Sequence, residues 1–335
     1  MKKLINDPFE FVDETLEGIL AAWPGHLKRC EGSDRALMRA DGPVEGKVAI
    51  VTGGGSGHIP VFLGYVGPGL LDAVSIGNVF SSPSPDDMLA ATAEAHGGAG
   101  VLHLYGNYSG DVMNFGMAAE MAETQDIEVE TSLVRDDVVS APVAEMEKRR
   151  AVAGLFFAYK IAGARAEEGA SLQEVKKAAD QAIFNTRSMG VALTPCTIPA
   201  AGEPTFEIGE DEMELGMGIH GEPGLRRGEI RPADEVVDEM VASILPDLPF
   251  ESGDEVAVLV NSLGATPPEE LFVMYRRVKH NLDEAGIDVY RPYVGEYATS
   301  MEMAGASVSL LKLDGDLKRL LDAPAYSPFL PQWPQ

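Results

Sequence analysis

The first half of the chain alternates short apolar runs with longer segments in which apolar side chains recur at helical spacing. The runs are rich in β-branched residues, which is typical of buried strands. They cover residues 48–51, 70–80, 100–105 and 127–134. Helices are predicted over residues 8–22, 85–95, 112–124, 151–168 and 171–189. Strands that alternate with helices in this way predict a doubly wound, mostly parallel α/β sheet.

The starts of two helices carry capping residues. Ser84 is the expected N-cap of the helix over 85–95, and Pro85 takes its first helical position. Ser171 and Glu174 have the spacing of a capping box, in which each side chain satisfies a backbone N–H of the other residue.

The second half predicts a mixed sheet with helices. Expected strands cover residues 189–199, 203–208, 214–219, 255–263, 289–294 and 307–313. One helix is predicted from Pro232 to about Leu245, and another begins at Pro267 with a capping box from Thr266 to Glu269. We therefore expect two α/β domains, residues 1–188 and 189–335, although no linker-like composition marks the boundary.

Composition changes this picture little, but charge narrows the choice of partners. Of 335 residues, 45% are hydrophobic and 24% are charged, as in ordinary globular proteins, and the net charge is −27. Binding to nucleic acids or anionic membranes needs clustered Lys and Arg, so the charge argues against both partners.

The chain is expected to be cytoplasmic. Its N-terminus lacks the apolar stretch of a signal peptide, and no segment approaches the length of a membrane span. Cys30 and Cys196 are the only cysteines and do not have metal-site spacing. They are therefore predicted to be free thiols in a reducing compartment.

A glycine cluster directly follows the predicted strand over 48–51. Gly53, Gly54, Gly55, Ser56 and Gly57 precede His58, so a titratable imidazole borders a segment where backbone can approach a ligand. Neither the dinucleotide fingerprint nor a Walker A loop fits the spacing. The alternative is an ordinary glycine-rich turn that carries a surface histidine.

Three ionisable groups share such a glycine-flanked setting. Asp111 follows the strand over 100–105, and His220 lies in the loop GMGIHGEPG. If neighbouring strands precede them, His58 and Asp111 meet at the carboxyl edge of the first sheet. Taken singly, each histidine is more often structural, and Asp111 is more often a helix N-cap. His96 and His103 are interpreted as structural.

Five separated motifs resemble the dihydroxyacetone kinase K-subunit family. They are GGGSGH with Pro60, FSSPSPDDM, NYSGDVMNF, GMGIHGEPG and LVNSLGATP. The resemblance runs in order from about residue 5 to residue 328. It implies two α/β domains and, usually, a homodimer.

The resemblance also implies roles for the candidate site residues. The family's histidine that forms a covalent hemiaminal with the ketone of dihydroxyacetone matches His220. His58 matches the histidine that hydrogen-bonds the substrate, and Asp111 matches the proposed base. Further pocket positions match Gly55, Ser56, Gly57, Ser82 and Gly106. No metal site is implied on this chain.

The family's chemistry also implies partners. Because no nucleotide loop is present, Mg²⁺ and ATP or ADP are expected on a separate nucleotide-binding subunit of the DhaL type. The phosphate donor is ATP, or a phosphotransferase-system relay that rephosphorylates bound ADP. A second interpretation is a non-catalytic paralogue that senses ketoses and acts as a coactivator of a transcription regulator.

Two positions depart from the family pattern. Ile59 replaces a glutamate, and Gly106 replaces a lysine. Both changes remove charge, and at position 106 the loss of a side chain is expected to free volume. These departures favour a four-carbon ketose such as erythrulose beside dihydroxyacetone. The alternative is that Ile59 packs into the core and Gly106 only eases a turn.

Overall fold

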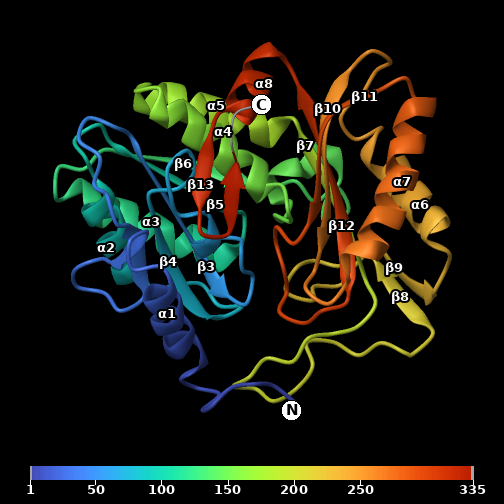
Figure 1. The fold of residues 1–335 in the computed structure, drawn as a ribbon, viewed down its shortest axis with the longest axis horizontal. Coiled ribbons are helices and arrows are strands. Elements are labelled where there is room, and N and C mark those ends of the chain that lie inside the picture. The colour runs from blue at the N-terminus through green and yellow to red at the C-terminus, as the bar shows by residue number, and fades with distance from the viewer. Residues whose placement is uncertain (1, 333–335) are drawn as a thin grey trace.

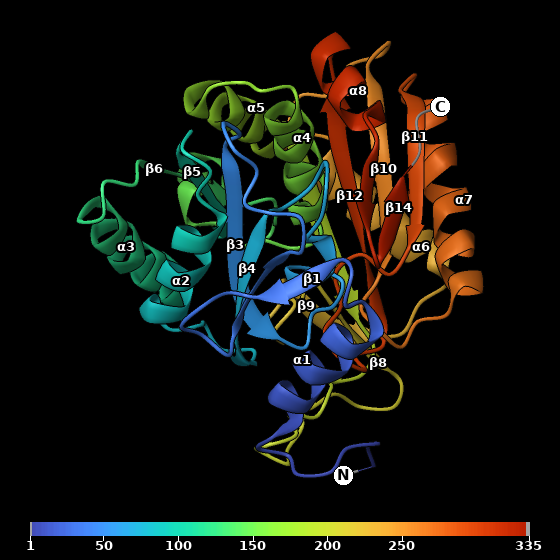
Figure 2. The ribbon, with the colours of Figure 1, turned by 60° about the vertical axis from the view of Figure 1, so that its left-hand side comes forward.

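The computed structural model describes residues 2–332 and consists of two six-stranded sheets that lie side by side (Figure 1). Helix α4 (Leu155–Glu167) lies between them, and α5 (Leu172–Phe184) packs beside α4 against β5 and β6 of the first sheet. Seen from a second direction, the two sheets still form separate layers (Figure 2). The predicted α/β class, with two sheets and flanking helices, is confirmed.

The first sheet is mostly parallel, as predicted. Its strand order is β1-β2-β4-β3-β5-β6; β3, β4, β5 and β6 run parallel, and β1 and β2 are antiparallel additions at one edge. The strands span Leu27–Arg29, Ala36–Arg39, Ala49–Ser56, Ala73–Val79, Val101–Gly106 and Val129–Val134 in chain order from β1 to β6. The sequence pattern did not predict β1 and β2, which are short and lack periodicity.

Helices cover both faces of this sheet. α1 (Phe11–Ala22) and α2 (Pro85–Ala95) agree with the predicted helices, and Ser84 accepts a hydrogen bond from the Asp87 backbone as the expected N-cap. α3 (Ser109–Glu123) packs beside α2 (Figure 1). The capping box of Ser171 and Glu174 is present at the start of α5. α5 ends at Phe184, so the helix predicted to reach residue 189 was too long.

The second sheet is mixed, as predicted. Its order is β11-β10-β12-β7-β8-β9, and only β10 and β11 are parallel neighbours. From β7 to β12 the strands span Thr186–Ala192, Glu212–Leu215, Arg226–Glu229, Glu255–Ser262, Asp288–Gly295 and Gly305–Leu313. Helices α6 (Ala233–Ile244) and α7 (Pro268–Glu284) cover its outer face (Figure 1).

Several expectations for the second half were wrong. The strand predicted over 189–199 ends at Ala192, and residues 203–208 form no strand. The strand predicted over 214–219 ends at Leu215, and the exposed strand β9 was missed. The capping box of α7 does not form, because the Thr266 hydroxyl instead accepts a hydrogen bond from the backbone of Gly305. Irregular loops therefore replace the expected strands around the His220 segment.

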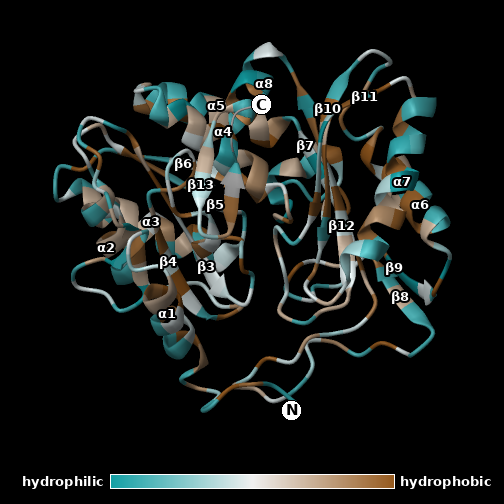
Figure 3. Cartoon of the chain, viewed as in Figure 1, coloured by the Kyte–Doolittle hydropathy of each residue, from teal (hydrophilic) through white to brown (hydrophobic). Residues whose placement is uncertain are grey.

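The largest core cluster contains residues of both halves. α4 is buried on almost every side and lies between the sheets, where Phe156 contacts Tyr293 of β11 at a ring-centroid distance of 4.9 Å. The apolar colouring of α4 and the inner strands shows this shared interior (Figure 3). The division between residues 188 and 189 stays a prediction, and it falls inside β7.

The end of the chain returns to the first half. α8 (Gly315–Asp322) is followed by the hairpin β13 (Ala325–Ser327) and β14 (Leu330–Gln332), and the Ser327 hydroxyl donates a hydrogen bond to the Gly64 carbonyl. The helices in residues 2–332 are too short or too polar to cross a bilayer.

Candidate active site

Three consecutive parallel strands end at one edge of the first sheet and present the candidate residues there. β3 leads to His58, β4 to Ser82 and β5 to Asp111. The ends of β3 and β4 are held together, because the Phe80 backbone N–H donates to the Ser56 carbonyl at 3.1 Å. The sequence pattern predicted this shared carboxyl edge.

The glycine cluster is less of a loop than expected. Gly53, Gly54 and Gly55 continue β3, and only Gly57 takes a positive φ, of 100°. Gly55 is needed for close packing instead: an added Cβ would lie 2.6 Å from the backbone nitrogen of Ser81. The prediction that the strand ends before the glycines was therefore wrong, since apolar periodicity cannot follow a strand through residues without side chains.

His58 is buried, with one ring nitrogen bonded and the other without a partner. Its Nδ1–H donates to the Thr299 carbonyl at 2.7 Å, which fixes Nε2 as the unprotonated nitrogen. Nε2 is buried and makes no hydrogen bond. Burial, together with the nearby charge of His220, lowers the pKa of His58 to about 3. The ring is therefore neutral and presents a free acceptor.

His220 reaches the same place from the second half of the chain. It follows β8 in a loop that folds back on itself, where the Gly218 N–H donates to the Glu222 carbonyl at 3.1 Å. The Glu222 carboxylate accepts two further hydrogen bonds, from the His220 backbone N–H and from His220 Nδ1, both at 2.9 Å. Burial alone would raise the pKa of Glu222, but the contacts with His220 lower it to about 2.

The rings of His58 and His220 meet edge-on. Their centroids are 4.7 Å apart with an interplanar angle of 82°. Phe80 stacks on His58 at 4.8 Å, and Tyr108 packs edge-on against His220 at 4.6 Å. The Tyr108 hydroxyl donates to the Ala151 carbonyl at 2.7 Å, which holds that ring in place. Aromatic side chains from the first half therefore seat the histidine of the second.

Asp111 lies in the first turn of α3, after the N-cap Tyr108, so it is not the cap itself. Its carboxylate accepts a hydrogen bond from the Ser82 hydroxyl at 2.5 Å. Burial raises the pKa of Asp111 to about 6, while the Ser82 hydrogen bond and the charge of His220 oppose that rise. A carboxyl with such a pKa changes charge near neutral pH, as a general base should.

The two positions that depart from the family pattern are both packed. A Cβ at Gly106 would lie 3.1 Å from Ala151 Cβ and 3.2 Å from the Tyr108 ring. The volume expected from the missing side chain is therefore filled. Ile59 is half-buried against the core cluster, and its carbonyl accepts a hydrogen bond from the Thr299 hydroxyl at 2.9 Å.

Sequence reasoning missed several residues of this site. Glu222 could have been found, because it follows His220 by two residues in the same loop. Phe80 and Tyr108 lie within matched motifs but are apolar enough to be taken for core. The Thr299 carbonyl has no sequence signature, since any residue supplies one. Within residues 2–332, no three His, Cys, Asp or Glu side chains group in a way that could hold a metal ion.

Comparison with known proteins places the chain. Residues 17–329 match the family described as the Dak1 domain. The chain belongs to the Dak1 domain family. The "PTS-dependent dihydroxyacetone kinase 2, dihydroxyacetone-binding subunit DhaK" of Listeria innocua is 46% identical over 98% of this chain and 99% of that protein. The "L-erythrulose kinase" of Pectobacterium atrosepticum is 44% identical over 98% of this chain but only 56% of its own length.

Two solved structures have the same fold. The dihydroxyacetone kinase of C. freundii is 34% identical, with a TM-score of 0.89 over 99% of this chain and 60% of that one. The "dihydroxyacetone kinase operon co-activator Dha-DhaQ" is 32% identical, with a TM-score of 0.87 over 93% of this chain and 96% of that one. The fold therefore occurs both in a kinase and in a protein named as a co-activator.

Proposed function

We propose that this Dak1 chain is the ketose-binding catalytic subunit of a dihydroxyacetone-type kinase. The observation that carries the proposal is the meeting of His58 and His220 beside the buried carboxyl of Asp111, with His58 Nε2 lacking a partner and His220 Nδ1 bonded to Glu222. The relatives named as dihydroxyacetone-binding subunits and erythrulose kinases support a short ketose as the substrate.

His220 is the proposed nucleophile. Glu222 holds the proton of the neutral ring on Nδ1, which leaves the Nε2 lone pair to attack the ketone carbon. One N–C bond forms, and the carbonyl π pair moves to oxygen. That oxygen gains a proton and the ring gives up the one on Nδ1, so the neutral hemiaminal retains every atom of the ketose. Glycerol lacks a carbonyl and cannot form it.

The surrounding groups position the captured ketose. His58 Nε2 is an acceptor without a partner, and a ketose hydroxyl would satisfy it. Gly55, Ser56 and Gly57 supply backbone at the end of β3, and Ser82 donates to Asp111. Gly106 allows Tyr108 to lie against His220. These contacts fix one end of the ketose and leave its terminal hydroxyl toward Asp111.

Asp111 is the proposed base for that terminal hydroxyl. Ionised above its pKa of about 6, the carboxylate takes the hydroxyl proton as the oxygen attacks the phosphoryl group. A separate DhaL-type subunit is proposed to carry Mg²⁺ with ATP or ADP, which would supply the electrostatic stabilisation of phosphoryl transfer. A phosphotransferase-system relay as phosphate donor fits the name of the Listeria relative, which is PTS-dependent. A homodimer is part of the proposal.

A second candidate function is ketose sensing without catalysis. The co-activator with a TM-score of 0.87 favours it, because the same fold serves regulation there. A sensor needs His220 to capture the ketose but has no use for a base. The hydrogen-bonded Asp111, with its pKa raised to about 6, therefore favours the kinase.

Intact-mass measurement tests the proposal. The chain is incubated with dihydroxyacetone, erythrulose or glycerol, and its mass is measured under non-denaturing conditions. A second sample is quenched in acid without borohydride, which tests whether the adduct is reversible. We expect a mass increase equal to the whole ketose for the two ketoses and none for glycerol. No adduct with any short ketose would contradict covalent capture, and an adduct with loss of water would indicate a lysine Schiff base instead.

A further inference from the structure

A separate groove lies where β6, α5 and the start of β7 meet. Its volume is about 540 Å³, and three cationic side chains line it: Arg135, Lys176 and Arg187. Leu133, Ile183 and Phe184 give it an apolar wall. No residue of the candidate active site takes part. A volume of this size is in the range of small-molecule sites.

Arg135 is the unusual member of this groove. It is half-buried, and among residues 2–332 its guanidinium has neither a hydrogen bond nor an ion pair. Every other arginine in that part of the chain donates to at least one protein acceptor. With 53 acidic against 26 basic residues, carboxylate partners are plentiful, so this one exception calls for an external anion.

The backbone forces a second arginine close to Arg135. The Ser188 N–H donates to the Asp136 carbonyl at 2.8 Å, and the Val138 N–H donates to the Ser188 carbonyl at 3.0 Å. Arg135 directly precedes Asp136, and Arg187 directly precedes Ser188, so these bonds bring the two arginines to the same wall of the groove. Two neighbouring cations repel each other unless an anion lies between them.

Protein carboxylates neutralise only part of this charge. Asp247 accepts hydrogen bonds from both Arg149 and Arg187, so one carboxylate serves two guanidinium groups. Burial lowers the pKa of Arg187, Asp247 opposes this, and the charge of Arg149 adds to the lowering. Lys176 is balanced by Asp180 at 2.9 Å. The lining itself carries three cations, Arg135, Lys176 and Arg187, against the single carboxylate of Asp180, and Arg135 is the cation left without a partner.

We propose that this groove binds the phosphate monoester of a small metabolite. A phosphate monoester is close to a dianion at neutral pH, which matches the excess charge, and the arginine fork suits its oxygens. The body of the ligand would lie on the apolar wall, where Phe184 is 58% exposed and stands beside Arg187 at 6.0 Å. A sugar phosphate and a nucleoside monophosphate share this chemistry.

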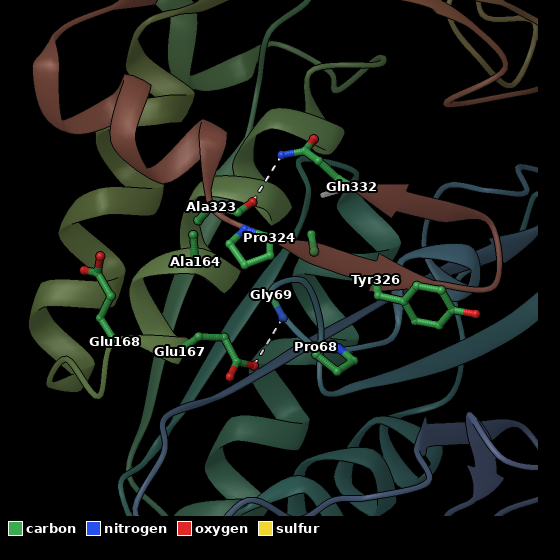
Figure 4. A pocket seen from close by; sticks show the side chains of 10 residues that line it. Pro68, Gly69, Ala164, Glu167, Glu168, Ala323, Pro324, Tyr326 and Gln332 are labelled. Atoms are coloured by element: carbon green, nitrogen blue, oxygen red, sulfur yellow. Dashed lines mark hydrogen bonds between the residues drawn. The ribbon is translucent and has the colours of Figure 1, made fainter. Parts of the chain in front are cut away.

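Another cavity shows by contrast what an occupied set of polar groups looks like. About 340 Å³ opens between α4 and the hairpin β13–β14, beside Tyr326 (Figure 4). Its Glu167 carboxylate already accepts hydrogen bonds from the Gly69 N–H and from Arg39, and its Gln332 amide donates to the Ala323 carbonyl. Its carboxylates and its glutamine amide have protein partners, so none of these groups requires a ligand.

The proposal does not rest on the proposed function and is tested by binding alone. Isothermal titration of the whole chain with dihydroxyacetone phosphate, AMP and orthophosphate should give one site for at least one organic phosphate. Arg135→Gln should weaken binding at least about tenfold, since a charge-assisted bidentate contact is lost. Arg135→Lys should restore only part of the affinity, because lysine lacks the planar fork. Arg276→Gln is the matched control, because Arg276 on α7 forms an exposed ion pair with Asp234 far from the groove.

Two further measurements distinguish a nucleoside monophosphate from a sugar phosphate, and the groove from the candidate active site. Phe184→Ala should weaken AMP but not dihydroxyacetone phosphate if a base stacks there, and should leave both unchanged if the ligand is a sugar phosphate. Binding should persist in His220→Ala, which keeps this site apart from the candidate active site. The proposal is overturned if no probe binds the parent chain at millimolar concentration, or if Arg135→Gln and Arg276→Gln bind alike.

Arginine labelling gives a readout that does not depend on the variants folding. Phenylglyoxal should modify Arg135, whose guanidinium makes no hydrogen bond or ion pair within residues 2–332, and a bound organic phosphate should protect it. The labelled position is mapped by peptide mass spectrometry after cleavage at acidic residues. Equal labelling of Arg135 with and without saturating phosphate ligand would contradict the proposal.

Discussion

The two halves of the candidate active site are built in different ways. In the first half, His58 and Asp111 sit at the ends of parallel strands and are 1% and 7% exposed. In the second half, His220 sits in an irregular loop, its side chain is 21% exposed, and Glu222 of the same loop holds it through two hydrogen bonds. The first half therefore gets its geometry from a sheet, whereas His220 is held by Glu222 of its own loop and by the rings of Phe80 and Tyr108.

This difference suits the proposed chemistry. A base and a hydrogen-bond acceptor must keep a fixed position relative to a small substrate, and strand ends hold side chains precisely because the backbone ladder fixes them. A nucleophile must move from attack to release, and a loop allows that motion. The comparison predicts that mutations in the second half should prevent formation of the ketose adduct, whereas mutations in the first half should reduce turnover.

The largest expected effect is the complete loss of covalent ketose binding when His220 is replaced. His220→Ala removes the proposed nucleophile, so the ketose adduct should disappear completely in intact-mass measurement. His280→Ala, an exposed histidine on α7, is the matched control and should form the adduct as the parent chain does. An adduct that persists in His220→Ala would place the nucleophile in the first half of the chain, and the proposed division of roles between the two halves would be wrong.

Loss of the base should leave capture intact and stop turnover. Asp111→Asn keeps the shape of the side chain but cannot take a proton, so kcat with a matched nucleotide-binding subunit should fall by roughly 10²–10⁴-fold. In the parent chain, kcat should decrease as the pH drops below about 6, where Asp111 becomes protonated. An unchanged kcat in the variant would leave Asp111 with a structural role only.

Stability provides an independent check on Asp111. Because its pKa is raised from 3.8 to about 6, the folded state binds more protons than the unfolded state between these values, and stability falls as the pH rises through them. At pH 7, Asp111→Asn should therefore unfold at an equal or higher temperature, with a gain of up to about 2–3 kcal/mol. A lower Tm would show that the carboxylate stabilises the helix start.

Sequence analysis predicted the first half of the site better than the second, for physical reasons. Apolar runs located β3 and β5, and the order of parallel strands then brought His58 and Asp111 to one edge. Residues 193–229 carry no such periodicity, so false strands were predicted around His220 and β9 was missed. The position of His220 beside His58 depends on how the two sheets pack, which only the tertiary structure gives.

Glu222 is expected to matter less than the residues it supports. Glu222→Gln keeps a hydrogen-bond acceptor for Nδ1 but loses the charge that stabilises the ring as the bond to carbon forms. The rate of adduct formation should fall by roughly 10–100-fold, as for other residues that orient a reactive histidine. The final amount of adduct should change little at saturating ketose. A rate equal to that of the parent would show that the loop backbone alone positions His220.

The smallest expected effect concerns the choice between ketoses and position 106. From sequence, Gly106 predicts added room for a fourth carbon, but the Tyr108 ring and Ala151 occupy that space. Gly106→Ala would therefore push on Tyr108, which packs against His220 at 4.6 Å, and should lower kcat/KM for erythrulose and dihydroxyacetone by similar factors. If Gly106 instead makes room for the extra hydroxymethyl group, erythrulose alone should suffer, by about 1–3 kcal/mol of discrimination. The ratio of the two specificity constants decides whether position 106 selects the substrate or seats the ring that holds the nucleophile.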